Sequence, residues 1–154
     1  NIEVRALSDD KQRKWLKRQK QTFDVVLTDV PCSGTGTWRR NPDTRWRTYG
    51  PGLDALLPVQ AEILERVAKC VKPGGRLVYA TCSLLPQENE EQVEKFLGSH
   101  PEFAVLPAAE IFGSSDLGAR FMRLTPRRHN TDGFFAAVLV RSAAATDETP
   151  DDQE

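Results

Sequence analysis

The chain of 154 residues has little cysteine, histidine and methionine, with three, two and one of each. An odd number of cysteines without a Cys-x-x-Cys pair argues against a disulfide framework, a zinc site and a dithiol redox protein. Free thiols are typical of a reducing compartment. We therefore expect a cytoplasmic protein that holds no metal.

Long apolar runs are also absent. No stretch approaches the roughly 20 apolar residues that a membrane-spanning helix needs, and the first residues lack the pattern of a signal peptide. The hydrophobic fraction of 39% and the charged fraction of 28% are those of an ordinary globular domain. We expect one domain with a buried core and no membrane contact.

The formal net charge of −1 conceals an uneven distribution. Five acidic residues lie in the last eight positions, and without them the formal charge is +4, which weakly favours a polyanionic partner. The acidic end and the Ala/Thr run before it have the composition of a disordered segment. We predict a folded domain over residues 1–142 and a disordered acidic tail over residues 143–154.

One stretch combines a strand signal with polar chemistry. Residues 24–28 (Asp-Val-Val-Leu-Thr) predict a buried strand, which Pro31 and Gly34 turn into a loop. Asp29 and Cys32 therefore stand where the strand ends, and ligands of open α/β sheets bind beyond the carboxyl ends of the strands. The alternative is that Cys32 is only a small buried apolar residue.

A second stretch repeats this pattern. Gly74 and Gly75 precede a strand over residues 76–81, and Cys82 stands at its carboxyl end. If the two strands are parallel neighbours, both thiols lie in one crevice. Cys70 falls on a predicted helix, so we assign it to packing rather than chemistry.

The remaining periodicity predicts an α/β protein. Apolar spacing indicates helices over residues 57–71 and 86–97, with Pro58 in the first turn of the former, and strands over residues 103–106 and 133–141. Residues 107–132 have no regular pattern. Strands separated by helices favour a mostly parallel sheet, and the short return to the last strand predicts one antiparallel edge strand.

Three of these stretches resemble motifs of a known family. Residues 29–36 (Asp-Val-Pro-Cys-Ser-Gly-Thr-Gly), 81–83 (Thr-Cys-Ser) and 129–135 (His-Asn-Thr-Asp-Gly-Phe-Phe) resemble motifs of the Sun/Fmu (RsmB-like, Nop/Sun) RNA 5-methylcytosine methyltransferases, in the family's order. The resemblance covers roughly residues 1–141. It implies a Rossmann-like class I methyltransferase sheet of strand order 3-2-1-4-5-7-6, the cofactor S-adenosylmethionine and an RNA substrate, with ribosomal RNA favoured.

Methylation of cytosine at carbon 5 needs a thiolate, a proton donor and a base, because carbon 5 becomes nucleophilic only after a thiolate has added to carbon 6. The residues alone do not decide which cysteine attacks. The resemblance implies that Cys82 is the nucleophile, that Cys32 assists product release, and that Asp29 is the motif acid near the cofactor and the target base.

The family's glycine-rich cofactor loop has no counterpart here, since no Gly-x-Gly stretch follows an early strand. The resemblance thus implies a truncated catalytic domain without its N-terminal cofactor-binding strands, and we expect it to be inactive alone. Residues 2–7 alternate as a further strand. We expect residues 2–7 to pair with the strand over residues 24–28. Otherwise, the unpaired edge of that strand should associate with another chain.

Two segments favour contact with RNA. Residues 11–20 hold six basic residues, and residues 38–52 place Arg39, Arg40, Arg45 and Arg47 among two tryptophans and a tyrosine. The alternatives are a solvated helix face and a loop whose tryptophans dock on the core. At the level of the whole chain, the alternative to an enzyme is a non-catalytic RNA-binding module derived from one.

Overall fold

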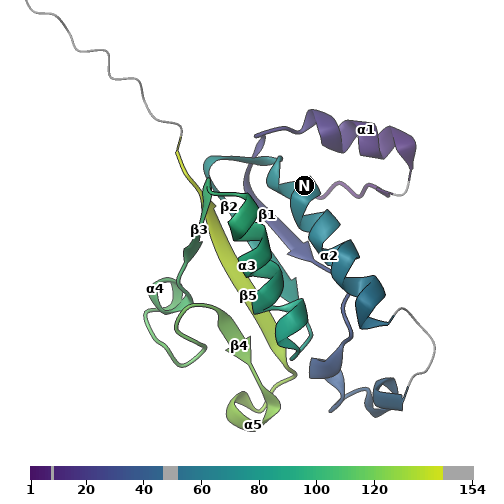
Figure 1. Ribbon diagram of the computed structural model, residues 1–154, viewed down its shortest axis with the longest axis vertical. Helices are drawn as coiled ribbons and strands as arrows, with labels where there is room; N and C mark the ends of the chain where they lie inside the picture. Colours follow the sequence, from purple (N-terminus) through teal and green to yellow (C-terminus); the bar gives the residue numbers. More distant parts are fainter. Residues whose placement is uncertain (8, 47–51, 144–154) are drawn as a thin grey trace, which may run out of the picture.

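The computed structural model describes residues 1–7, 9–46 and 52–143, which form a single sheet with helices packed against it (Figure 1). The predicted acidic tail lies, except for residue 143, outside the described residues and stays a prediction. The principal elements in chain order are α1 (Asp10–Arg18), β1 (Phe23–Asp29), α2 (Leu53–Ala68), β2 (Val71–Thr81), α3 (Glu90–Ser99), β3 (Phe103–Leu106), α4 (Ala108–Phe112), β4 (Met122–Leu124), α5 (Pro126–His129) and β5 (Phe134–Arg141). Three short 3-10 turns complete the list: η1 (Thr35–Thr37), η2 (Pro42–Trp46) and η3 (Pro86–Glu88).

The sheet has the strand order β1-β2-β5-β3, with β4 also paired to β5. β1 and β2 are parallel, and β5 runs antiparallel to β2, β3 and β4. Four strands therefore share one direction, which confirms the mostly parallel sheet with one reversed strand. The order also matches the 4-5-7-6 part of the Rossmann-like methyltransferase sheet.

The reversed strand is not at the edge where the sequence placed it. Leu139 of β5 lies opposite Leu77 of β2 on one side and opposite Val105 of β3 on the other. The interior position follows from its sequence, because alternate residues of β5 are apolar and fully buried, as expected for a strand with neighbours on both sides.

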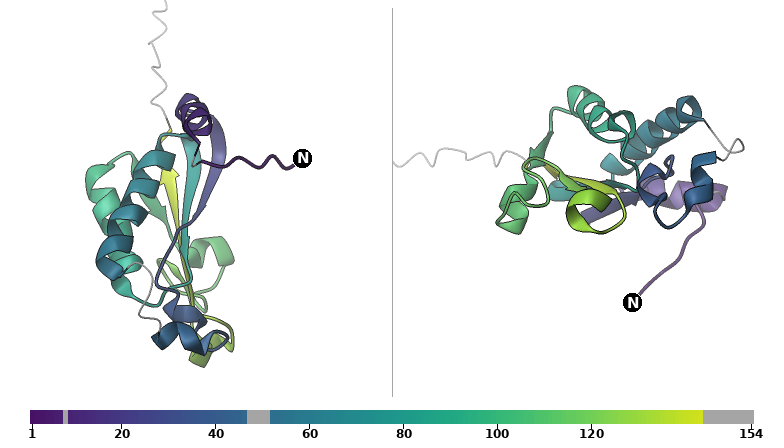
Figure 2. Two further views of the ribbon diagram at one scale, coloured as in Figure 1. Left: turned by 90° about the vertical axis from the view of Figure 1, so that its right-hand side faces the viewer. Right: turned by 90° about the horizontal axis from the view of Figure 1, so that it is seen from below.

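The core lies between the sheet and the helices α2 and α3, which lie side by side on one face (Figures 1 and 2). The register of β2 with β5 puts Tyr79 beside Ala137 and Leu77 beside Leu139, all fully buried. Leu64 of α2, together with residues of α3, packs into the same cluster. This packing makes β2 and β5 the most enclosed strands of the sheet.

The predicted strand over residues 2–7 is wrong. These residues have no strand partner in the described part of the chain, and Ile2 and Val4 are 94% and 90% exposed. Arg5 instead lies over the ring of Trp15, 4.3 Å from its centroid, so the segment folds back on α1. Alternation alone cannot form a strand, because the extended backbone needs a neighbouring edge for its hydrogen bonds.

Other boundaries also differ. α2 begins at Leu53, so Pro58 lies in the second turn rather than the first. β2 begins at Val71, and its register against β1 jumps between the pairs Phe23–Val71 and Val25–Arg76, so the glycine pair forms an irregularity inside the strand. Pro86 begins η3, and α3 follows only from Glu90.

The segment predicted as irregular, residues 107–132, contains α4, β4 and α5. Each has five residues or fewer, too short for a periodic pattern to be detected. β4 forms because β5 offers it an edge, a tertiary condition that the local sequence does not contain.

Candidate active site

The two thiols singled out from the sequence lie together. Cys32 follows β1, Cys82 follows β2, and the parallel pairing of these strands puts both at the same end of the sheet. The two Sγ atoms are 3.4 Å apart, within hydrogen-bond distance for sulfur, and both side chains are half-buried. The expectation that the two thiols lie close together is confirmed.

The thiols share a proton unequally. The hydrogen bond from the Cys32 thiol lowers the pKa of Cys82 from its ordinary value of 9.0 to about 7, against the opposing effects of burial and of the Asp29 and Glu88 carboxylates. The same contact, followed by burial, raises the pKa of Cys32 well above its usual range. Of the two thiols, Cys82 is therefore the one that ionises more readily near neutral pH, with Cys32 as its protonated partner.

Asp29 is the last residue of β1 and is exposed. Its backbone pairs in register with Ala80, two residues before Cys82. The structure thus puts the third predicted site residue at the same end of the sheet, with its carboxylate accessible to a ligand.

Gly36 lies where three segments cross. Its N–H donates to the carbonyl of Cys82 at 2.9 Å, and its own carbonyl accepts from the N–H of Gly133 at 2.8 Å. A Cβ at position 36 would lie 2.3 Å from the Gly133 oxygen, so only glycine fits. Through this crossing the C-terminal motif around Gly133 reaches the two cysteine loops.

The arginines of the loop after Cys32 are partly structural. Arg39 donates to the carbonyl of Asn130 at 2.8 Å, and Arg40 pairs with Asp132 at 2.9 Å. Both contacts fasten this loop to the C-terminal motif. Arg47 and Tyr49 lie outside the described residues.

Arg45 has a different environment. Its guanidinium lies 5.5 Å from the ring centroid of Trp38 and 5.1 Å from that of Trp46, and Trp46 is 74% exposed. Exposed aromatic rings beside a guanidinium are the surface on which unpaired bases stack. The tryptophans do not both dock on the core, contrary to the alternative drawn from the sequence.

Glu88 is a residue of this site that the sequence did not reveal. Its side chain is fully buried and accepts hydrogen bonds from Ser33 and Ser83, which directly follow Cys32 and Cys82. The available signal was the serine that directly follows each cysteine, one of them five positions before this acid and the other 55.

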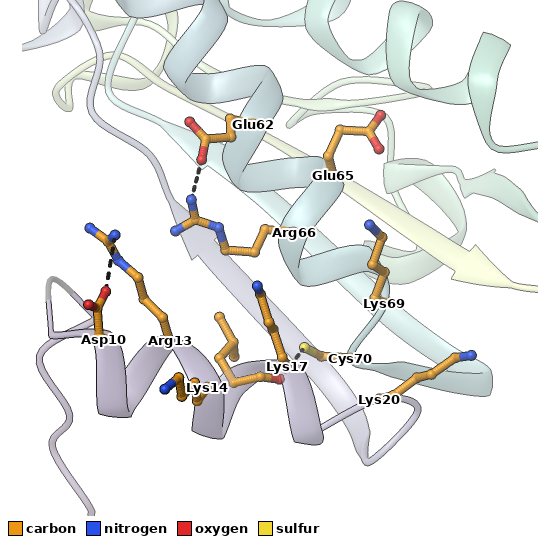
Figure 3. Close-up of a pocket in the computed structure, with 11 residues that line it drawn as sticks. Asp10, Arg13, Lys14, Lys17, Lys20, Glu62, Glu65, Arg66, Lys69 and Cys70 are labelled. Carbon is orange, nitrogen blue, oxygen red and sulfur yellow. Dashed lines mark hydrogen bonds and ion pairs between the residues drawn. The ribbon is translucent and has the colours of Figure 1, made fainter.

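A cleft lies elsewhere, between α1 and α2 (Figure 3). It has a volume of about 710 Å³. The cleft lies near the amino ends of β1 and β2, whereas the two thiols follow the carboxyl ends of these strands. Cys70 is buried in its wall, with its Sγ 3.9 Å from the Leu16 carbonyl, as expected for a packing residue. Six basic side chains line this cleft: Arg13, Lys14, Lys17, Lys20, Arg66 and Lys69.

These cations come from two segments that are distant in sequence. The predicted basic helix is α1, and its Lys17 points across the cleft towards α2 (Figure 3). Three acidic residues also line it, and two of them pair with arginines, Asp10 with Arg13 and Glu62 with Arg66. We refer to this feature as the basic cleft.

Within the described residues, no group of three or more His, Cys, Asp or Glu side chains is arranged to hold a metal ion. No helix among those residues is both long and apolar enough to span a bilayer.

The order of strands and the pair of thiols at one end of the sheet define a Rossmann-like methyltransferase domain. The family model described as 16S rRNA methyltransferase RsmB/F matches residues 1–140, and the chain belongs to this family. This confirms the resemblance drawn from the three motifs.

Curated relatives agree with this assignment. The chain is 40% identical over 124 residues to ribosomal RNA small subunit methyltransferase B of Shewanella oneidensis, covering 80% of this chain and 28% of the relative. It is 37% identical over 142 residues to a probable ribosomal RNA small subunit methyltransferase B of Synechocystis, covering 90% and 32%. The chain therefore spans about a third or less of the length of these relatives.

Solved structures show the same fold. The crystal structure of PH0851 superposes with a TM-score of 0.70 at 41% identity, covering 78% of this chain and 27% of that one. NSun6 from Pyrococcus horikoshii, solved with SFG, gives a TM-score of 0.58 at 25% identity, covering 77% and 30%.

Proposed function

We propose that this chain is the cysteine-bearing part of an RNA cytosine-5 methyltransferase that acts on ribosomal RNA. The observation that carries the proposal is the contact of 3.4 Å between the two sulfurs, which favours a thiolate on Cys82 near neutral pH. A thiolate is the form that adds to carbon 6 of a pyrimidine. Membership of the RsmB/F family supports ribosomal RNA as the substrate.

The reaction begins with Cys82. Its thiolate forms a bond to ring carbon 6, and the electron pair of the 5,6 double bond becomes available at carbon 5. Asp29, exposed to solvent at the end of β1, relays a proton from solvent to ring nitrogen 3, and this proton neutralises the charge that develops on the ring. Carbon 5 then takes up the methyl group.

Cys32 completes the cycle. Once Cys82 is bound to carbon 6 it carries no negative charge, and the main cause of the high pKa of Cys32 is removed. Cys32 can then lose its proton to solvent and, as a thiolate, act as the base that takes the proton from carbon 5. The electron pair restores the double bond, the Cys82 sulfur leaves as a thiolate, and the proton on nitrogen 3 returns to solvent through Asp29.

S-adenosylmethionine, when bound, supplies the methyl group. Asp29 fits a contact to it, as an exposed carboxylate at the carboxyl end of a strand, and a structural relative was solved with SFG, an analogue of this cofactor. In the described part of the chain, no strand and glycine-rich turn precede β1. We therefore propose that the 154 residues alone bind the cofactor poorly and are inactive.

A second candidate is an RNA-binding module without catalysis. The basic cleft and the Arg45–Trp46 pair favour it, because cations and exposed rings bind the backbone and the bases of RNA without any cofactor. These surfaces equally serve the enzyme, so RNA binding alone does not separate the two candidates.

Trapping with RNA that contains 5-fluorocytidine separates them. Fluorine at carbon 5 cannot leave as a proton does, so the enzyme at its full natural length with S-adenosylmethionine gives an adduct that survives denaturation. The module gives none. Calorimetry of the 154-residue chain with S-adenosylmethionine tests the fragment separately: micromolar binding would overturn the proposal that it binds the cofactor poorly.

A further inference from the structure

The side chain of Glu88 connects the two cysteine loops, which carry Cys32 and Cys82. Its Oε1 accepts from the Ser33 N–H at 2.8 Å, and its Oε2 accepts from the hydroxyls of Ser33 and Ser83. Each serine is the residue directly after a site cysteine, although the two serines are 50 positions apart. A single carboxylate therefore holds both loops at positions adjacent to the thiols.

Other buried groups hold Glu88 in this orientation. The Gln60 side chain of α2 donates to Glu88 Oε1 at 3.0 Å and to the Pro31 carbonyl at 2.9 Å. The Tyr79 hydroxyl of β2 donates to the Glu88 carbonyl at 2.6 Å. Gln60, Tyr79 and Glu88 are all 0% exposed, so this carboxylate has no solvent to turn towards.

The charge of Glu88 has hydrogen bonds but no cation among the described ion pairs. A buried carboxylate without a cation is unfavourable unless several donors compensate it. Four donors do so here, and two belong to one cysteine loop and one to the other. An apolar side chain would be enough to fill this position. A carboxylate here therefore indicates that hydrogen-bond acceptors are needed towards both cysteine loops.

We propose that Glu88 is a positioning residue that locks the two cysteine loops in register, so that the Cys32 thiol is aimed at the Cys82 sulfur. The contact between the sulfurs joins loops at the ends of different strands, and β1, which carries Cys32, has an exposed side. Without the shared carboxylate, the contacts that remain between the loops include the Gly36–Cys82 backbone bond, the Thr35 hydroxyl contacts and a 3.3 Å contact between the Ser33 and Ser83 hydroxyls, none of which involves a charged group. The consequence for methylation rests on the proposed function; the effect on the thiol pair does not.

The variants Glu88→Ala and Glu88→Gln act on Cys82 in opposite directions. The groups that act on this thiol are Cys32, which lowers its pKa, and the Asp29 and Glu88 carboxylates, which raise it. Glu88→Ala removes the Glu88 charge but also releases the loops; the Cys32 hydrogen bond, the largest influence on this thiol, is then lost, so the pKa of Cys82 rises from about 7 towards 9.0. Glu88→Gln keeps the shape and removes the charge, so the pKa of Cys82 falls below that of the parent. A residue that only fills space would not give two opposite shifts.

The experiment measures the rate of iodoacetamide alkylation of Cys82 against pH, followed by mass spectrometry of its peptide, in the folded chain. We expect the midpoint to rise by about one pH unit or more in Glu88→Ala and to fall in Glu88→Gln. Glu91→Gln, an exposed acid on α3, is the matched control and should leave the midpoint unchanged. An unchanged midpoint in a folded Glu88→Ala variant overturns the proposal.

If Glu88→Ala does not fold, Ser83→Ala provides the test. It removes one donor to the carboxylate and leaves the charge in place, so the midpoint should rise by less than a unit; no change overturns the proposal. The alkylation readout is independent of methylation. If the unmutated full-length protein forms no adduct with RNA but the variants shift the pKa of Cys82 as expected, the proposed function alone is refuted. If methylation is normal and Glu88→Ala leaves the pKa of Cys82 unchanged, the positioning role alone is refuted.

Discussion

The loops after β1 and β2 have nearly the same sequence pattern, a strand followed by Cys-Ser, yet they have different surroundings. β2 lies between β1 and β5, and its Leu77 is fully buried; β1 borders β2 alone in the described part of the chain, and its Leu27 is 68% exposed. Cys82 follows the enclosed strand and Cys32 the exposed one, yet the contact between the two thiols is the main cause that lowers the pKa of Cys82 and raises that of Cys32. The comparison teaches that two nearly equal local patterns acquire different chemistry from a contact that only the tertiary structure makes.

The largest effect is expected for a change at Cys82, the thiol that follows β2. Cys82→Ala in the full-length protein should abolish both methylation and the adduct with 5-fluorocytidine RNA, a loss on the order of 10⁴-fold or more, as for other covalent nucleophiles. The measurements are tritium transfer from labelled S-adenosylmethionine and a denaturing gel. Adduct formation retained here and lost in Cys32→Ala would reverse the assignment of the two thiols.

Cys32→Ala tests the other loop and should give a different result. Methylation slows while a covalent protein–RNA complex accumulates, seen as a slowly migrating band on a denaturing gel. The pKa of Cys82 should also rise from about 7 towards 9.0, because its hydrogen-bond donor is gone. Alkylation of Cys82 at pH 7 then slows by about 50-fold, since the thiolate fraction falls from about one half to about one in a hundred. Normal turnover without the band would make Cys32 a structural thiol.

A third prediction compares the unpaired edge of β1 with the enclosed strand β2. Residues 2–7 do not cover it, so pairing with a second chain remains the predicted outcome. We expect slow hydrogen exchange at the Val25 and Leu27 amides that depends on protein concentration, together with a dimer mass in sedimentation. Leu77 of β2 is the control and should be protected at every concentration. Fast exchange at Leu27 in a stable monomer would show that the edge is simply open.

The smallest effect concerns the arginines of the loop after Cys32. Arg45→Ala should weaken RNA binding a few-fold and flatten the slope of log K against log salt by about 0.7, the value for one phosphate contact on a single strand. Arg40 pairs with Asp132, so Arg40→Ala should instead loosen the loop and change the slope less. Filter binding at several salt concentrations measures both. Equal slopes for Arg45→Ala and the parent would leave Arg45 as a scaffold residue.

Local sequence was sufficient for the strands that carry the thiols. The run before Asp29 and the run before Cys82 are short, apolar and β-branched, and proline or glycine ends or precedes them, so both appear as β1 and β2. The motif around Gly133 was predicted from local sequence too. Local sequence was not sufficient at residues 2–7, because an alternating pattern forms a strand only where a neighbouring edge is available for pairing.

By itself, then, the sequence determined the two strand ends, the residues that stand there and the family they resemble, because these depend on neighbours within a few positions. The tertiary structure decided the 3.4 Å contact between Cys32 and Cys82, the interior place of β5 and the burial of Glu88. Those features join residues about 50 positions apart. They depend on which strands become neighbours and in what register, and pairing over such distances is set by the packing of the whole sheet.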